Sequence, residues 1–411
     1  MAAKPPPMPV APLLPICLDL TRLARRVGHG PPTGIDRVDQ AYFTEFLGSE
    51  AELFGLIRTK LGFLLLDRGG MEAACDALLV SVGDPEGMNE GHAAKRRAVR
   101  KKVLRLLRSL AIARTPRWGV ARMICQHLPA NLRYLNLGHA NLERSIVGAV
   151  RSLSGGRAIA MIHDTIPLDR PDTIVPKSAV GFRRTMGAAL ACDLLLANSD
   201  QTRADILRFG GKRTPPVEVL ALGMTSRLRR TNDEPDPADP SIFVMLGTIE
   251  PRKNHALMLA VWQHFHDTRP PDDIPHLVIV GGRGWENKDV FETLDNAPFM
   301  GRTVHEAGRL DDTELSGILS RATALLFPSL AEGYGLPPME AAAIGLPVIS
   351  ADLAPVRAIL GDYPVYVDTG DMQQWTNAID HMVATGRSSA WKQPPPLPTW
   401  ESHFRQLRAL L

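Results

Sequence analysis

The chain has 411 residues, of which 45% are hydrophobic and 22% are charged, and its formal net charge is +3. This composition is ordinary for a globular protein, and the length is sufficient for two domains that each bury a core. So small a net charge gives no reason to expect nucleic acid as a partner.

The cysteine pattern and the apolar runs predict the compartment. The four cysteines are widely spaced and form no C-x-x-C pair, which argues for a reducing compartment and against a disulfide framework or zinc site. No apolar run reaches about 18 residues, so no transmembrane helix is expected. Segment 1–20 contains too many prolines for the apolar region of a signal peptide. We therefore expect a cytoplasmic protein.

Apolar, β-branched runs alternate with helical patterns along the chain, which predicts an α/β protein with parallel sheets covered by helices. The segment 225–240 is rich in proline and acidic residues and is interpreted as an exposed linker. We expect an N-terminal domain over 1–228, a C-terminal domain over 229–397, and a last helix, 398–411, that returns to the first domain. The expected strands are 14–20, 76–83, 133–138, 158–164, 193–199, 217–222, 241–247, 276–282, 322–328, 346–350 and 365–368.

Open α/β sheets bind ligands beyond the carboxyl ends of their strands, which directs attention to segment 327–350, FPSLAEGYGLPPMEAAAIGLPVIS. After the apolar strand a loop carries Glu332, and the prolines Pro337 and Pro338 suit the first turn of a helix that contains Glu340. Free N–H groups at a helix N-terminus suit a diphosphate, and carboxylates accept hydrogen bonds from sugar hydroxyls. The alternative is an ordinary strand–loop–helix unit with an acidic first turn.

This segment resembles the E-x7-E signature of retaining glycosyltransferases of the GT-B fold, the "glycosyl transferases group 1" or family 4 group. The matching pattern is F-P-S-x-x-E-G-x-G-L-P-x-x-E-A-x-A-x-G-x-P-V-I. The resemblance implies two Rossmann-like domains whose parallel sheets face each other across a donor-binding cleft. Further similar segments are GTIEPRKN (247–254), 305–329, MIHDTIPL (161–168) and LLLANSDQTRADI (195–207), while GPPTGIDRV (30–38) and YLNLGHANL (134–142) resemble bacterial polysaccharide mannosyltransferase-like members.

The resemblance implies roles for individual residues. It implies that Glu332 lies by the donor sugar and that Glu340 binds the ribose hydroxyls. It implies that Arg252 and Lys253 neutralise the diphosphate and that His163 approaches the transferred sugar. The other implied donor contacts are Gly34, Thr248, Gly333, Tyr334, Gly335, Leu336 and Leu310, and the acceptor-side residues are Asp164 and Arg37.

Some of these positions have other interpretations. A strand-end histidine such as His163 is more often structural, Arg252 and Lys253 could form a solvated helix start, and Gly34 could belong to a surface turn. The family often has arginine where this chain has Thr248, and Arg252 could replace that contact. No D-x-D pair occurs, which fits a metal-independent enzyme without a cofactor, because the nucleotide sugar is a substrate.

The implied reaction transfers a sugar with retention of its anomeric configuration. The acceptor hydroxyl attacks from the leaving-group side, and the departing phosphate oxygen takes its proton. GDP-mannose is the leading candidate for the donor, and a glycan or lipid-linked saccharide of bacterial surface polysaccharide is the candidate acceptor. The alternatives are a UDP-sugar donor and a non-catalytic binding protein of the same fold; no G-x-G-x-x-G follows a strand, which argues against an oxidoreductase.

The N-terminal half contains one long basic stretch. Residues 91–142 contain twelve lysines and arginines and no acidic residue, and within 95–118 apolar residues fall on one helical face. Such a helix is typical of proteins that lie on an anionic membrane surface, here the inner face, or that bind a partner. The alternative is a helix that packs on its own domain with a solvated basic face.

Overall fold

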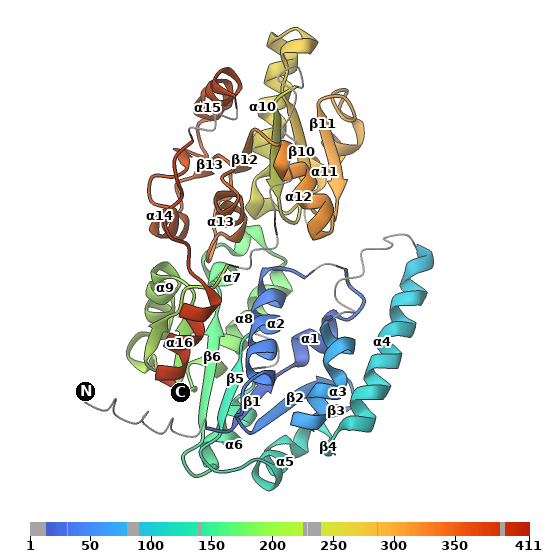
Figure 1. Cartoon of the computed structure of the whole chain (residues 1–411), viewed down its shortest axis with the longest axis vertical. Helices are drawn as coiled ribbons and strands as arrows, with labels where there is room; N and C mark the ends of the chain where they lie inside the picture. Colours follow the sequence, from blue (N-terminus) through green and yellow to red (C-terminus); the bar gives the residue numbers. More distant parts are fainter. Residues whose placement is uncertain are drawn as a thin grey trace, which may run out of the picture.

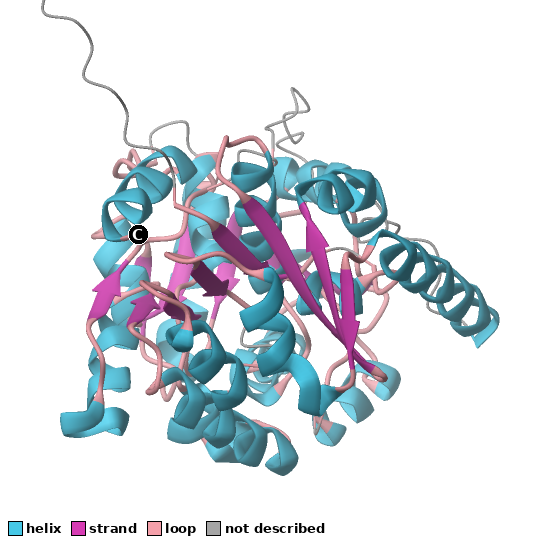
Figure 2. Ribbon diagram, turned by 90° about the horizontal axis from the view of Figure 1, so that it is seen from below, coloured by secondary structure: helices cyan, strands magenta, loops and turns pink. Residues whose placement is uncertain are grey.

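The computed structural model describes residues 14–30, 32–79, 90–138, 142–224, 228, 240–285, 287–386 and 391–411, without the side chains of 90–95, 176 and 177. It contains two α/β domains, one above the other along the longest axis, each with its own sheet (Figure 1). Helices lie on both sides of the strands, as the view from below shows (Figure 2). The expected linker falls outside the described residues except for Leu228 and Pro240.

The N-terminal sheet has the strand order β4-β3-β2-β1-β5-β6-β7-β8. Its β2–β3 and β3–β4 pairs are antiparallel, and its other pairs are parallel. Its strands are β1 (Ile16–Asp19), β2 (Leu53–Thr59), β3 (Gly62–Asp67), β4 (Ala113–Thr115), β5 (Arg133–Asn136), β6 (Arg157–Ile162), β7 (Leu194–Ala197) and β8 (Val217–Val219). Its helices are α1 (Thr21–Arg26), α2 (Gly34–Leu47), α3 (Arg68–Leu79), α4 (Glu90–Leu110), α5 (Val120–His127), α6 (Arg144–Ser152), α7 (Ile166–Asp169), α8 (Pro176–Ala189) and α9 (Asp200–Gly210).

The C-terminal sheet is entirely parallel and has the order β11-β10-β9-β12-β13-β14. Numbered within the sheet, this is the order 3-2-1-4-5-6, which places the topological switch point between β9 and β12. Its strands are β9 (Ile242–Leu246), β10 (His276–Val280), β11 (Val304–Gly308), β12 (Ala324–Phe327), β13 (Val348–Ala351) and β14 (Val365–Val367). Its helices are α10 (His255–Thr268), α11 (Lys288–Asn296), α12 (Asp312–Arg321), α13 (Leu336–Ala343), α14 (Ala354–Leu360) and α15 (Met372–Thr385).

One expectation about secondary structure is wrong, and one hairpin was missed. Residues 76–79, predicted as part of a strand, end helix α3, because Met71, Ala74 and Leu78 are buried at helical spacing; residues 80–83 lie outside the described residues. The hairpin of β2 and β3 was not predicted, since its arms are near-continuous apolar runs that lack alternation. The other expected strands are present.

The basic stretch forms a helix over only part of its length. α4 ends at Leu110, and the N–H of Ile112 then donates to Leu65 O at 2.9 Å, so that the chain adds β4 to the edge of the sheet instead of continuing the helix. Val103 and Leu107 are buried on α4, whereas the side chain of Trp118 is 86% exposed. The apolar face of α4 therefore packs on its own domain, and its basic residues lie on the other faces.

The last helix, α16 (Trp400–Leu410), packs on the N-terminal domain (Figure 1). Tyr42 Oη and His403 Nε2 are 2.7 Å apart, and the rings of Tyr42 and Phe404 meet edge to face at 5.0 Å. Arg133 Nε donates to Leu411 O at 2.6 Å. These buried contacts tie the end of the chain to α2 and β5.

Candidate active site

A cleft of about 420 Å³ lies between the carboxyl ends of the two sheets. Its volume falls within the range of about 300–1,000 Å³ that is typical of small-molecule sites. It lies at the switch point of the C-terminal sheet, where ligands of such sheets bind. Every site residue predicted from the sequence lines it: Gly34, Arg37, His163, Asp164, Thr248, Arg252, Lys253, Leu310, Glu332, Gly333, Tyr334, Gly335, Leu336 and Glu340.

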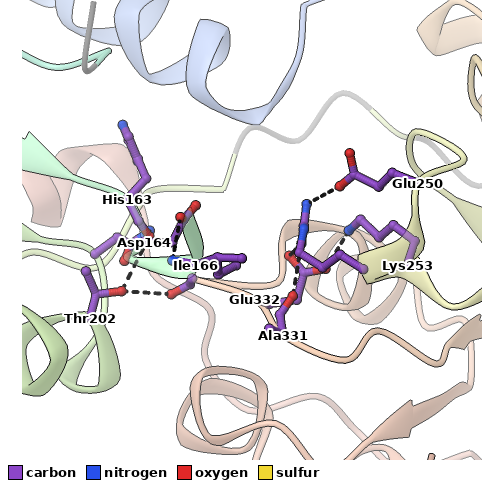
Figure 3. Close-up of polar contacts among 11 residues, drawn as sticks. His163, Asp164, Ile166, Thr202, Glu250, Lys253, Ala331 and Glu332 are labelled. Carbon is purple, nitrogen blue, oxygen red and sulfur yellow. Dashed lines mark hydrogen bonds and ion pairs between the residues drawn. The ribbon is translucent and has the colours of Figure 1, made fainter. Parts of the chain in front are cut away.

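Glu332 lies between two cations from the turn after β9. Lys253 Nζ is 2.6 Å from Glu332 Oε1, and Arg252 Nη1 is 2.7 Å from Glu332 Oε2. The other edge of the Arg252 guanidinium meets Glu250 Oε1 at 2.7 Å. Figure 3 shows Glu250, Lys253 and Glu332 together on the C-terminal domain. Arg252 and Lys253, which were predicted to neutralise the diphosphate, are therefore both paired with Glu332, the carboxylate predicted to lie by the donor sugar.

The electrostatics of this cluster favour the charged forms of Glu332 and Arg252. Burial alone would raise the pKa of Glu332, but the attraction of Arg252 and Lys253 outweighs it and lowers that pKa to about 2. Burial lowers the pKa of Lys253, although Glu332 opposes this shift. Burial also acts against the charge of Arg252, yet Glu332 and Glu250 raise its pKa above the ordinary value. Glu332 is thus an ionised acceptor, and it is already paired.

The loop after β12 is seated on both domains. Within its own domain, Leu330 N donates to Arg252 O at 2.8 Å. Across the domains, Ser199 Oγ donates to Gly333 O at 2.8 Å. A Cβ atom on Gly333 would lie 2.0 Å from His163 O, so only glycine permits this approach of the two backbones.

The side chain of Tyr334 anchors the loop to the N-terminal domain. Its side chain is 5% exposed, and its hydroxyl donates to Leu222 O of the N-terminal domain at 2.7 Å. The side chain is therefore engaged in the contact between the domains, and only the backbone of Tyr334 remains for the predicted donor role.

Glu340 is held differently from Glu332. It lies in α13 and forms an ion pair with Arg37 of α2, so the partner comes from the opposite domain. Arg37 Nη2 also lies 3.9 Å from Asp312 Oδ1. A Cβ atom on Gly34 would lie 2.9 Å from Leu336 Cδ1, which shows how closely the start of α2 approaches the start of α13.

The start of α13 offers fewer N–H groups to an anion than an ordinary helix. Pro337 and Pro338 follow its first residue, Leu336, and neither has an N–H. Gly335, with φ of 98°, turns the chain into the helix. The expected anion site at the helix start is thus limited to Leu336 and the loop residues before it.

His163 and Asp164 follow β6 on the N-terminal side of the cleft (Figure 3). His163 Nε2 is 2.6 Å from Leu137 O, and since a carbonyl only accepts, this nitrogen carries a proton. Burial lowers the pKa of His163 to about 4, so the ring is neutral at neutral pH. Burial likewise raises the pKa of Asp164 above its usual range, against the attraction of Arg252.

The cleft also contains Asn198, which the sequence did not single out, and Gly282, whose turn after a strand was equally open to a structural or a site-bordering interpretation. Asn198 follows β7, is 3% exposed and has a buried Oδ1 without a hydrogen-bond partner. Gly282 lines the cleft beside Arg309, whose Nη1 donates to His29 O of the N-terminal domain at 3.1 Å. Asn198 and Gly282 both follow strands, so their place after a strand was the signal available.

Among the described residues, no group of three or more histidine, cysteine, aspartate and glutamate residues could hold a metal ion. No helix within the described ranges is long and apolar enough to cross a membrane.

The chain is similar in sequence to a known family model and to several curated proteins. Residues 227–390 match the family model "Glycosyl transferases group 1", so this part of the chain is similar to that family. It is 28% identical over 275 residues to "Serotype-specific mannosyltransferase WbdA" of Escherichia coli, which covers 61% of the chain and 33% of that protein. It is 26% identical over 249 residues to "O-antigen chain mannosyltransferase B" of E. coli, covering 58% and 63%. The chain thus spans about a third of the length of the first of these curated relatives.

Solved structures share the fold over nearly the whole chain. Anabaena Alr3699/HepE, solved in complex with UDP and glucose, superposes with a TM-score of 0.61 at 13% identity and covers 97% of this chain and 99% of that one. The apo form of the lipopolysaccharide outer core galactosyltransferase WaaB gives a TM-score of 0.58 at 13% identity with the same coverage. The two stacked α/β domains are therefore a GT-B fold.

Proposed function

We propose that the chain is a retaining glycosyltransferase that moves a sugar from a nucleotide-sugar donor to a glycan or lipid-linked saccharide. One observation carries the proposal: an ionised, doubly paired Glu332 and a second glutamate, Glu340, flank one cleft at the switch point of the C-terminal sheet. A carboxylate at each end of the cleft suits a ligand with hydroxyls at both ends, such as a sugar joined to a ribose through a diphosphate.

The cations act on the leaving group. In the proposed reaction the bond between the anomeric carbon and the phosphate oxygen breaks, while a bond from the acceptor oxygen forms on the same face. The acceptor proton passes to the departing phosphate oxygen. Arg252 and Lys253 stabilise the growing negative charge on the diphosphate, because they are fixed in place before the reaction starts.

Thr248 cannot supply a cation at the end of β9, and Arg252 offers a replacement. Its guanidinium is fixed by Glu250 on one edge and by Glu332 and Ala331 O on the other, the last at 3.0 Å. A guanidinium held on both edges is already oriented, and a diphosphate needs only to approach it.

The curated relatives support a finer proposal for the substrates. Their names describe mannosyltransferases, two of them of the O-antigen chain, so we propose mannose as the sugar, GDP-mannose as the donor and a bacterial surface polysaccharide or its lipid-linked precursor as the acceptor. The UDP-sugar alternative has support in the neighbouring structure solved with UDP and glucose.

The proposed donor site is tested by thermal-shift measurements with GDP, UDP, dTDP and ADP and with their sugars. One nucleotide is expected to raise the melting temperature of the wild type and to lose this effect in Glu340→Ala. Incubation of the matching nucleotide sugar with saccharide acceptors then tests transfer, and the anomeric configuration of the product tests retention. A wild type that responds to no nucleotide would support the non-catalytic alternative.

We also propose that the basic face of α4 contacts an anionic membrane surface. Lys101, Lys102 and Arg105 are exposed on it, while Val103 and Leu107 are buried against the domain. Each such cation contributes about 1 kcal/mol near an anionic leaflet. Liposome sedimentation tests this: the wild type is expected to bind anionic vesicles and a Lys101→Glu/Lys102→Glu/Arg105→Glu variant is not. Equal binding to anionic and neutral vesicles would contradict the proposal.

A further inference from the structure

A second cavity opens on the far side of the Glu332 loop. It has a volume of about 310 Å³ and shares Asp164, Glu332 and Gly333 with the donor cleft as a common wall. The two cavities thus meet at the residue that we propose lies beside the transferred sugar. The wall between the two cavities is formed by the Glu332 loop and by Asp164, which follows β6.

Both domains build this second cavity. From the N-terminal domain, α9 presents Gln201, Thr202, Asp205 and Arg208, which recur at helical spacing along one face. From the C-terminal domain, the start of α14 contributes Ala354. Figure 1 shows α9 and α14 facing each other across the boundary between the domains, on the opposite side of the molecule from α4.

A third cavity continues the second. It has a volume of about 460 Å³, shares Asp352 and Leu353 with the second cavity and follows the ends of β13 and β14. There Arg357 forms two hydrogen bonds with Asp352, at 2.7 and 2.9 Å, and covers the ring of Tyr366 at 3.8 Å. The second and third cavities, together called the lateral groove here, run from the donor cleft to the outside of the C-terminal domain.

The cations that line the lateral groove are each paired with a carboxylate. Arg208 pairs with Asp169, at 2.5 Å, and with Asp205, at 2.7 Å, while Arg170 pairs with Asp172 and Arg357 with Asp352. The carboxylate of Glu332 is itself balanced by Arg252 and Lys253. Among the described residues that line the groove, no cation is therefore left over to attract a phosphate or a uronate, while the carboxylate oxygens can still accept hydrogen bonds from hydroxyls.

We infer that the lateral groove binds the acceptor, and that its terminal segment is a neutral glycan rather than an acidic one. The inference rests on the proposed function, because it takes Glu332 as the place of the transferred sugar. The terminal hydroxyl of the glycan lies at the shared wall of Asp164, Glu332 and Gly333, and the rest of the glycan extends between α9 and α14. The groove thereby gives the C-terminal domain a part in acceptor recognition.

A matched pair of substitutions tests this inference. Ala354 and Ala358 are both exposed and lie one turn apart on α14, but only Ala354 lines the lateral groove. Ala354→Trp is expected to fill the groove, and Ala358→Trp is the control. Gln201→Trp repeats the test from the opposite wall, with the exposed Arg203→Trp of the same helix as its control.

The first measurement is saturation-transfer NMR with methyl α-mannoside, a neutral mannotriose and a glucuronate-containing disaccharide, each in the presence of the nucleoside diphosphate that binds. Mannotriose is expected to bind the wild type and both controls, and to lose at least ten-fold in affinity in Ala354→Trp and Gln201→Trp. Binding that is equal in all variants, preferential binding of the glucuronate compound, or no binding of either neutral saccharide would overturn the inference.

Nucleotide binding separates this outcome from a failure of the proposed function. The nucleoside diphosphate is expected to bind all four tryptophan variants as it binds the wild type, because none of these positions lines the donor cleft. In a transfer assay, the two groove variants should raise the KM for the saccharide at least ten-fold and leave the KM for the donor unchanged. A wild type that binds no nucleotide contradicts the proposed function itself, and saccharide binding measured without nucleotide then still decides for or against the groove.

Discussion

The two glutamates of the cleft lie eight residues apart and are held in opposite ways. Glu332 is paired with Arg252 and Lys253 of its own domain, so the charge partners at the proposed sugar end come from the C-terminal half. Glu340 is paired with Arg37 of the other domain. In the proposed site, the carboxylate at the sugar end is therefore held within one domain, whereas the carboxylate at the ribose end must exchange a contact between the domains for the nucleotide.

Glu332→Gln is expected to have the largest effect, because it changes the carboxylate at the proposed sugar end. The substitution leaves the buried Lys253 without its counter-charge and leaves Arg252 with Glu250 alone, which costs about 3 kcal/mol in the free energy of unfolding. Transfer is expected to fall by roughly 10²–10³, because the neutral amide no longer offers a charged acceptor to the transferred sugar in the transition state. Denaturant unfolding and a single-turnover assay measure the two effects. A variant that keeps wild-type stability and rate would show that the network has no role.

Gly333→Ala tests the contact of the sugar end with the opposite wall. The added methyl group would lie 2.0 Å from His163 O, so the loop must shift to make room for it. Such overpacking costs about 1–3 kcal/mol in the free energy of unfolding. Transfer is expected to fall by about ten- to a hundred-fold. Gly317→Ala in α12 is the control, since its methyl group meets nothing within 4 Å and alanine favours a helix. Equal behaviour of the two variants would mean that the loop position is unimportant.

Arg37→Ala tests the ribose end. If Arg37 only holds Glu340 until the nucleotide arrives, its removal frees the carboxylate, and nucleotide affinity rises about three- to five-fold, as expected for one lost competing hydrogen bond. Calorimetric titration measures this change. A fall in affinity would instead assign Arg37 to a direct contact with the bound phosphates, and the ribose end would then not depend on an exchange.

The smallest expected effect concerns pH. The pKa of His163 is lowered from 6.5 to about 4 by burial, so the unfolded chain binds its proton more readily between these values. Stability from this residue is therefore complete above pH 6.5 and is lost as the pH falls toward 4. The pKa of Glu332 is lowered from 4.5 to about 2, so its contribution to stability is full above pH 4.5 and is lost as the pH falls from there toward 2. His163→Gln should flatten the fall in melting temperature between pH 6.5 and 4, and an unchanged slope would contradict the neutral assignment.

Much of the C-terminal half could be predicted from the sequence because its determinants are local. The strand before Pro328, the glycines of the loop and the prolines at the start of α13 follow one another along the chain, and the structure has them in that order. The resemblance brought in Arg252 and Lys253, which the structure places beside Glu332.

The unpredicted features depend on distant parts of the chain. Arg37 and Glu340 are 303 positions apart, and a single sequence contains no local pattern that predicts their ion pair. The β2–β3 hairpin is local, but its continuous apolar runs lack the apolar–polar alternation that predicts a strand. β4 forms by pairing with the edge of β3, about 50 residues earlier in the chain. The hydrogen bond of Tyr334 to Leu222 likewise needs both domains in place.

The most direct test of the account titrates a nucleoside diphosphate and its nucleotide sugar into wild type, Glu332→Gln and Glu340→Gln by calorimetry. The account predicts that Glu340→Gln weakens both ligands by a similar factor of about ten, the loss of a hydrogen bond to a charged group. It predicts that Glu332→Gln weakens only the nucleotide sugar and leaves the diphosphate at least as tightly bound. Equal losses for both ligands in both variants, or no loss in Glu340→Gln, would contradict the division of the cleft into a sugar end and a ribose end.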